Sequence, residues 1–190
     1  MRNECLGINC LWSFVIEFGI DLLLFLIPIY FLILLNPKEN IKNIFLSLGF
    51  KKISFKDIFK HTIILFFLLF LLSYTLSFIS VFFKISDLNL VGQEILKLPI
   101  SVLIYMFVIR VFLEEWFFRS FLVPKIGAIF SSIIFAIAHI GYGSIIQVLG
   151  AFFLGVLLSV YYKKTGSIIP NYFAHFLYNL SIYLILVVFI

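Results

Sequence analysis

The strongest constraint on this chain is a series of apolar runs long enough to cross a lipid bilayer. A membrane-spanning α-helix needs about 20 mainly apolar residues. Runs that reach or approach this length, separated by breakers such as Asn-Pro and Thr-Gly, lie at residues 11–35, 58–83, 98–122, 126–140, 145–162 and 168–190. The pattern predicts an all-α, polytopic transmembrane helix bundle of about six transmembrane helices.

The composition excludes a soluble globular protein. Of the 190 residues, 64% are hydrophobic and 12% are charged, whereas soluble domains are about half apolar and a quarter charged. One core in a chain of this length cannot bury so much apolar surface. We therefore expect residues 1–190 to form a single integral membrane domain in contact with the lipid bilayer, without a separate soluble module.

Positive charges gather on one side of the predicted membrane, and this bias sets the orientation. The residues on that side are Lys38, Lys42, Lys51, Lys52, Lys56, Lys60, Arg119, Lys125, Lys163 and Lys164, against Arg2, Lys84 and Lys97 on the other side. By the positive-inside rule, this multi-pass protein of the cell membrane has its basic loops in the cytoplasm and both termini outside. The net charge of +5 comes from such loops, so we expect no nucleic-acid partner.

The first long loop is open to two interpretations. Residues 41–55 mix lysines with large apolar side chains. This stretch is either a short amphipathic segment on the cytoplasmic headgroups or a solvated loop.

Ionisable side chains inside the predicted spans are the functional candidates, because each costs about 2.5–3.5 kcal/mol at a helix centre on insertion scales. They fall in three of the later spans. These candidates are Arg110, Glu114, Glu115, Arg119, His139 and His175, and the amide of Asn179 lies one helical turn after the last of them.

Counting along the helices places four of these groups at similar depth. At 1.5 Å per residue, Glu114 and His139 lie about 15 and 20 Å from the basic side of the membrane. His175 and Asn179 lie about 10 and 16 Å from the same side. The spacing therefore allows a carboxylate, two imidazoles and an amide to meet inside the bundle.

Spacing within each helix also assigns partners. Glu115 and Arg119 are four residues apart with the acid first, which favours a structural ion pair on one helical face. Arg110 and Glu114 have the same spacing, so a second pair is possible. If Glu115 is neutralised in this way, Glu114 is the carboxylate that faces another helix.

Such a group of side chains can hydrolyse a peptide bond without a covalent intermediate. A carboxylate near a neutral imidazole can take the proton of an attacking water. A second imidazole and an amide can donate to the oxyanion that forms. A zinc site through Glu114, His139 and His175 is the alternative, and we favour the interpretation without a metal or other cofactor.

Three motifs resemble those of one family, the CAAX protease and bacteriocin-processing (CPBP, or Abi) family. Residues 114–119 resemble its E-E-x-x-x-R motif, residues 135–139 its F-x-x-x-H motif, and residues 175–179 its H-x-x-x-N motif. The family includes the type II CAAX prenyl endopeptidases, and the resemblance covers residues 98–180. Three motifs in this order, each on a predicted span, form a specific signal.

The resemblance implies a role for each motif residue. Glu114 and His139 would activate water, and His175 and Asn179 would form the oxyanion hole. The supporting residues of the span would be Glu115 and Arg119. The residues thus predict an intramembrane endopeptidase of the glutamate type, and residues 98–180 would be its catalytic core.

The expected substrate is a membrane-anchored or lipidated peptide, such as a CAAX-type C-terminus or a bacteriocin leader. A site that faces the cytoplasm suits such a peptide. The alternatives are a non-enzymatic membrane scaffold or immunity protein with a structural charged core, and a small transporter with a proton relay. Glu17 and Asp21 either line a substrate path or, as we favour, face the bundle near Arg110. His61 is expected to be a hydrogen-bonded packing residue.

Overall fold

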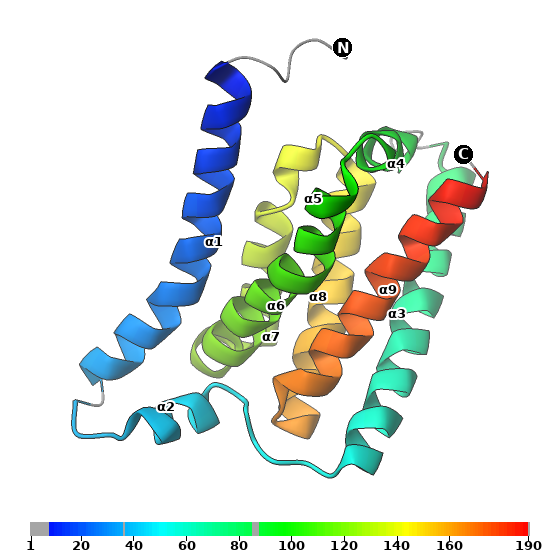
Figure 1. Cartoon of the computed structure of the whole chain (residues 1–190). Helices are drawn as coiled ribbons and strands as arrows, with labels where there is room; N and C mark the ends of the chain where they lie inside the picture. Colours follow the sequence, from blue (N-terminus) through cyan, green and yellow to red (C-terminus); the bar gives the residue numbers. More distant parts are fainter. Residues whose placement is uncertain (1–7, 36, 85–87, 190) are drawn as a thin grey trace.

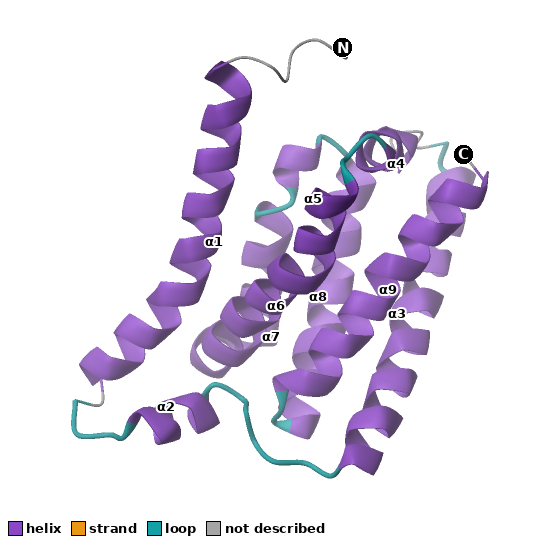
Figure 2. Ribbon diagram, viewed as in Figure 1, coloured by secondary structure: helices purple, strands orange, loops and turns teal. Residues whose placement is uncertain are grey.

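We describe the protein from a computed structural model, which places residues 8–35, 37–84 and 88–189. This described part is helical apart from short loops and one isolated bridge between Phe50 and Ser167 (Figure 2). Within it, five helical stretches are long and apolar enough to cross a membrane: residues 16–35, 55–82, 100–142, 145–165 and 168–189. The predicted all-α, multi-pass membrane fold is confirmed.

The longest stretch accounts for two of the six predicted passes. It begins with α5 (Ile100–Ile104), η1 (Tyr105–Arg110), α6 (Val111–Glu114) and η2 (Glu115–Leu122), and it ends with α7 (Val123–Ile137) and η3 (Ile140–Tyr142). Figure 1 shows that α7 turns and runs back beside the earlier segments. The turn is at Gly127, whose φ of 84° and ψ of 169° lie in a region open almost only to glycine.

The other long helices complete the bundle. They are α1 (Ile8–Leu35), α3 (Phe55–Phe82), α8 (Ile145–Thr165) and α9 (Ile168–Phe189). The start of α1 and the end of α9 lie at one end of the bundle, as an even number of passes requires (Figure 1). The prediction started α1 and α3 three residues too late and ended α8 three residues too early, because hydrophobic patterns locate the ends of helices less well than the helices themselves.

The basic end of the bundle is closed by α2 (Ile41–Ser47). Its N-cap is Asn40, whose side chain accepts a hydrogen bond from the backbone N–H of Lys42. Ile44 and the following Leu48 are buried at 6% and 1% exposure. Residues 41–47 of this stretch therefore form a short helix whose apolar side packs on the bundle, and its contact with the headgroups stays a prediction.

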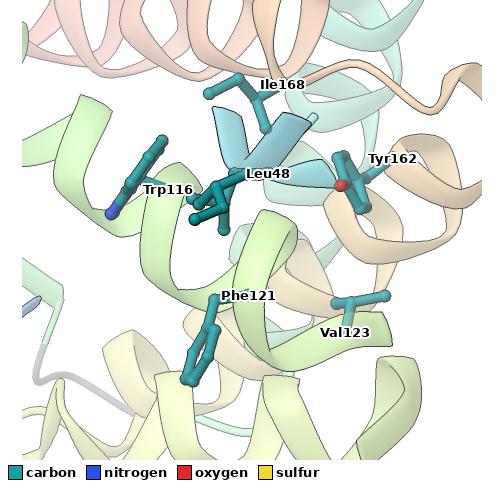
Figure 3. Packing of buried hydrophobic residues seen from close by; sticks show 7 residues of the cluster. Leu48, Trp116, Phe121, Val123, Tyr162 and Ile168 are labelled. Carbon is teal, nitrogen blue, oxygen red and sulfur yellow. The ribbon is translucent and has the colours of Figure 1, made fainter. Parts of the chain in front are cut away.

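Gly49, which follows α2, also contacts the bundle. Its carbonyl accepts a hydrogen bond of 3.1 Å from the backbone N–H of Ile168. Figure 3 shows Leu48 inserted among side chains of several helices. We call this group the basic-side plug: Ile44, Leu48, Trp116, Phe121, Val123, Tyr162 and Ile168.

A short helix that the sequence did not predict lies at the opposite end. This helix, α4 (Leu88–Leu96), follows α3 and precedes the long bent stretch. Val91 and Gly92 on one side of it are buried, while Gln93 and Glu94 are exposed. Figure 1 shows α4 at the end of the bundle where α9 finishes. The two ends of the bundle are thus covered by two different short helices.

Candidate active site

The centre of the site is a completely buried carboxylate. Glu115 has 0% exposure, and its Oε1 lies 2.9 Å from Nδ1 of His175. The other oxygen, Oε2, accepts a hydrogen bond of 3.3 Å from the side-chain amide of Asn171. These contacts join η2 to α9 deep inside the protein. A carboxylate in such a place needs partners, because an unpaired buried charge is strongly unfavourable.

Arg119 supplies the balancing charge. Its Nη1 lies 3.5 Å from Oε1 of Glu115, with both side chains almost fully buried. The guanidinium carbon lies 4.1 Å from the centre of the Phe135 ring, so the cation also stacks on an aromatic face. The predicted structural pair of Glu115 and Arg119 is confirmed.

Asn171 is a site residue that the sequence analysis missed. Its amide nitrogen donates to Glu115 and also to the carbonyl of Leu158, the latter at 2.8 Å. A signal was present, because Asn171, His175 and Asn179 follow one another at intervals of four and share a helical face. The first of them holds the buried carboxylate, and it lies outside the three motifs.

His175 lies between two consecutive glutamates. Its Nδ1 contacts Glu115, while its Nε2 lies 4.0 Å from Oε2 of Glu114. The two glutamates diverge because neighbouring residues of a helix point about 100° apart. The side chain of Glu114 keeps 15% of its exposure, against 0% for Glu115. Glu114 faces His175 of α9 as expected, but the hydrogen bonds to that helix come from Glu115, which the prediction paired only with Arg119.

The π-helical geometry around Glu114 is itself unusual. The segments η1 and η2 are both π-helical and lie directly before and after α6, which ends at Glu114. Long π-helical turns are rare and are often found at functional sites. They change the angular position of side chains relative to an ordinary α-helix, which a count of residues from the sequence does not anticipate.

His139 is oriented by the residue that begins its motif. Its Nδ1 lies 2.7 Å from the carbonyl oxygen of Phe135. Since a carbonyl only accepts, Nδ1 carries the hydrogen, and Nε2 of the neutral ring keeps its lone pair. The ring also packs on Phe135, with 4.4 Å between centres. Phe135 therefore contacts both His139 and the guanidinium of Arg119.

One cavity of about 390 Å³ connects the predicted catalytic residues. Its wall includes Glu114 from α6, His139 after α7, and both His175 and Asn179 from α9. The supporting residues Glu115 and Arg119 are not part of the wall. The structure thus brings all four predicted catalytic side chains to one space and keeps the ion pair behind it.

The comparison with protein families agrees with this arrangement. Residues 96–181 match the family model described as type II CAAX prenyl endopeptidase Rce1-like. We call residues 96–181, which match this model, the CAAX-protease-like domain. The resemblance drawn from the three motifs is confirmed, and the family is a family of proteases. Comparisons with curated proteins and with solved structures found no match.

The CAAX-protease-like domain contains all of the predicted site residues, and it begins at the end of α4 and ends in α9. A second charged group joins it to α1, which lies before the matched segment. Arg110 Nη1 lies 3.3 Å from Oε2 of Glu17, and Arg110 Nε lies 3.7 Å from Oδ1 of Asp21. Tyr105 donates a hydrogen bond of 2.7 Å to Asp21.

Two predictions concerned Glu17 and Asp21 of α1. Their predicted place beside Arg110 is confirmed. The possible pair of Arg110 with Glu114 is not among the ion pairs of the described residues, because Arg110 turns to the α1 carboxylates instead. A substrate path along Glu17 and Asp21 stays a prediction.

A metal was the alternative chemistry for the CAAX-protease-like domain. In the part of the chain that the structure describes, no three or more His, Cys, Asp and Glu side chains are grouped as metal ligands. Nδ1 of His175 is already engaged by Glu115, and Nδ1 of His139 by a carbonyl. These contacts leave Nε2 of both rings available, as in many zinc sites where the second ring nitrogen donates to a carboxylate or a carbonyl. Zinc binding by Glu114, His139 and His175 therefore stays a prediction for chemical analysis.

Proposed function

We propose that this protein is an intramembrane endopeptidase in which Glu114 and His139 activate a water molecule that attacks a peptide carbonyl. The observation that carries the proposal is the common cavity of Glu114, His139, His175 and Asn179, which come from three separate segments of the bundle. The family match gives independent support for peptide hydrolysis. The expected substrate is a peptide associated with the membrane.

Glu114 suits the role of general base. It faces the cavity, and its nearest ionisable partner is 4.0 Å away, whereas Glu115 is held by three side chains. The lone pair on Nε2 of His139 can hold the same water as an acceptor. Proton transfer from water to a positioned carboxylate gives a hydroxide equivalent next to the substrate carbonyl.

His175 and Asn179 suit the stabilisation of the oxyanion. They lie one turn apart on α9 and both line the cavity. In its protonated form His175 donates through Nδ1 to Glu115 and presents Nε2–H to the cavity. The carboxamide of Asn179 adds a second donor. Donors fixed before the reaction are effective where water is scarce.

The charges of the site fit this sequence of steps. Glu114, Glu115 and Arg119 together carry one negative charge, which a protonated His175 balances. When Glu114 takes the proton of the attacking water, the negative charge moves to the oxyanion. It therefore stays near the same imidazolium. The tetrahedral intermediate then collapses, and the leaving amine receives the proton from Glu114.

The test is comparative proteomics of membranes that contain the wild type or Glu114→Gln. We expect at least one peptide fragment of a membrane-associated protein to be present with the wild type and absent with the variant. The matched control is Glu94→Gln, which changes an exposed glutamate that pairs with Lys97. Identical fragments in wild type and Glu114→Gln would contradict the proposal and favour a non-enzymatic scaffold or immunity protein.

Metal dependence is tested on the same material. We expect purified active protein to contain no stoichiometric zinc and to keep its activity after treatment with a chelator. Loss of cleavage on chelation, restored by zinc, would replace the metal-free interpretation by the zinc alternative.

A further inference from the structure

The cavity at the site occupies only one half of the bundle. It includes residues of α8 from Ile146 to Leu158, but none of the last turns of that helix. On α9 it begins at His175 and continues to Leu186, near the end of the helix. Because α8 runs towards the basic loops and α9 runs away from them (Figure 1), both ranges lie on the side of the bundle remote from the lysines.

The half nearer the lysines is filled with side chains. Trp116, Leu48 and Ile168 of the basic-side plug have exposures of 0 to 1%, and Figure 3 shows them packed together. A second buried group includes Leu65 and Tyr161, at 0% and 6% exposure, and neither of them lines the cavity. A peptide that entered from the basic side would have to displace these side chains.

The remote end of the cavity is bordered by α4. Val91, Gly92 and Ile95 of this helix line the cavity, while Gln93 and Glu94 on its other side are exposed. A short helix with one apolar and one polar side suits a position at the membrane interface. The wall between α4 and the catalytic residues is mostly apolar, with polar side chains such as Ser73 and Ser77 of α3.

We propose that the substrate reaches Glu114 from the membrane face that carries α4, the start of α1 and the end of α9, opposite the lysine-bearing loops. This inference rests on the proposed endopeptidase function and names its substrate class. The substrate is a peptide segment with apolar side chains that lies on, or inserts from, that face. The positive-inside rule makes this the outer face, whereas the sequence analysis expected a site that faces the cytoplasm.

The size and the lining of the cavity agree with this substrate class. A volume of about 390 Å³ is within the range of pockets that enclose small organic ligands, so it suits a short stretch of peptide. Apolar residues such as Leu76, Ile95 and Ile182 provide most of the wall above the catalytic residues. They favour apolar side chains on both sides of the cleaved bond.

The opening is tested by labelling with a membrane-impermeant sulfonated thiol reagent. Ser77→Cys is introduced into full-length protein that also carries Cys5→Ser and Cys10→Ser, because Ser77 lines the cavity and the change is nearly isosteric. Lys52→Cys marks the basic face, and Gln93→Cys marks the α4 face; both positions are exposed. Right-side-out and inside-out vesicles are compared.

We expect Ser77→Cys to react from the same side as Gln93→Cys and from the side opposite to Lys52→Cys. Reaction from the Lys52 side, or from neither side, would overturn the inference. This readout does not depend on activity. It therefore locates the opening even if no cleavage is found and the proposed endopeptidase function fails.

A second measurement connects the opening with the substrate. Labelled Ser77→Cys should lose the cleavage fragment that the unlabelled variant produces, whereas labelled Lys52→Cys should keep it. If labelled Ser77→Cys still cleaves at the unlabelled rate, the substrate does not use this half of the cavity and the inference is wrong. If wild type yields no fragment but labelling follows the expected pattern, only the proposed function has failed.

Discussion

The two halves of the bundle differ in how they surround a glutamate side chain. In the half near the basic loops, Glu115 is sealed by Arg119, Asn171 and His175. In the other half, its neighbour Glu114 faces a cavity and keeps part of its exposure. Of these two adjacent residues, Glu115 belongs to a buried ion pair that stabilises the fold, and Glu114 is the proposed general base. The comparison teaches that the fully buried Glu115 orients His175, and that the partly buried Glu114 lies beside the same imidazole on the cavity side.

The largest expected effect follows from changing the glutamate on the cavity side. Glu114→Gln should lower the rate of peptide cleavage by about 10²–10⁴-fold, the usual contribution of a general base. Thermal unfolding in detergent should stay close to that of the wild type, because Glu114 makes no close ion pair. Cleavage at the wild-type rate by this variant would break the comparison.

The next effect concerns the buried glutamate. Glu115→Gln leaves Arg119 as an uncompensated buried cation, so we expect the free energy of unfolding to fall by about 3–5 kcal/mol. Arg119→Met combined with Glu115→Gln should recover part of this loss, since it removes both charges. Denaturant titration of the single and double variants provides the measurement. An unchanged stability of Glu115→Gln would show that this carboxylate is not sealed.

A smaller loss of stability is expected for Asn171, the site residue that the sequence analysis missed. Asn171→Ala removes one donor from Glu115, and we expect a loss of about 1–3 kcal/mol in the free energy of unfolding. Asn179→Ala is the matched variant on the same helical face. It should lower the cleavage rate and leave stability nearly unchanged. The reverse pattern would exchange the functions assigned to the two amides.

The backbone turn at Gly127 should give a comparable or smaller effect. Its backbone conformation costs about 1–3 kcal/mol for other residues, although no atom lies within 4 Å of an added Cβ. Gly127→Ala should therefore lower the melting temperature through backbone strain alone. An unaffected melting temperature would place the turn elsewhere in residues 100–142.

The smallest effect is expected far from the site. His61 packs on Tyr161 and makes a 3.1 Å hydrogen bond to its hydroxyl group, as the sequence analysis expected of a packing residue. His61→Phe should lower the free energy of unfolding by about 0.5–1.5 kcal/mol. The cleavage rate should remain that of the wild type, and a large loss of activity would give this histidine a role that the account does not include.

Most of the fold and the site's main residues could be predicted because they depend on local signals. Apolar length fixed the passes, and the spacing of four fixed the pair of Glu115 with Arg119. The convergence of Glu114, His139 and His175 could be expected from their depths. The partner of His175 could not be predicted. Which of the two adjacent glutamates faces His175 depends on the rotation of the helix about its axis and on the π-helical turns beside it.

The features that escaped prediction depend on contacts between distant segments. The short helix α4 is too short to be recognised from the length of its apolar run. The packing of Leu48 beside Trp116 and Ile168 cannot be predicted from the sequence of the first loop alone. The direction of the cavity follows from that packing. Counting residues along the helices gives the distance of the catalytic residues from the basic face. It does not show to which face the cavity opens.

The account's central claim is that Glu114 activates water in a cavity that the Glu115 pair supports. The most direct measurement is single-turnover cleavage in ¹⁸O-labelled water by purified protein in lipid nanodiscs, with the fragment found by proteomics as substrate. The account predicts ¹⁸O in the new carboxylate with the wild type, and product formation about 10²–10⁴-fold slower from a folded Glu114→Gln protein. Labelled product formed by Glu114→Gln at the wild-type rate would contradict it.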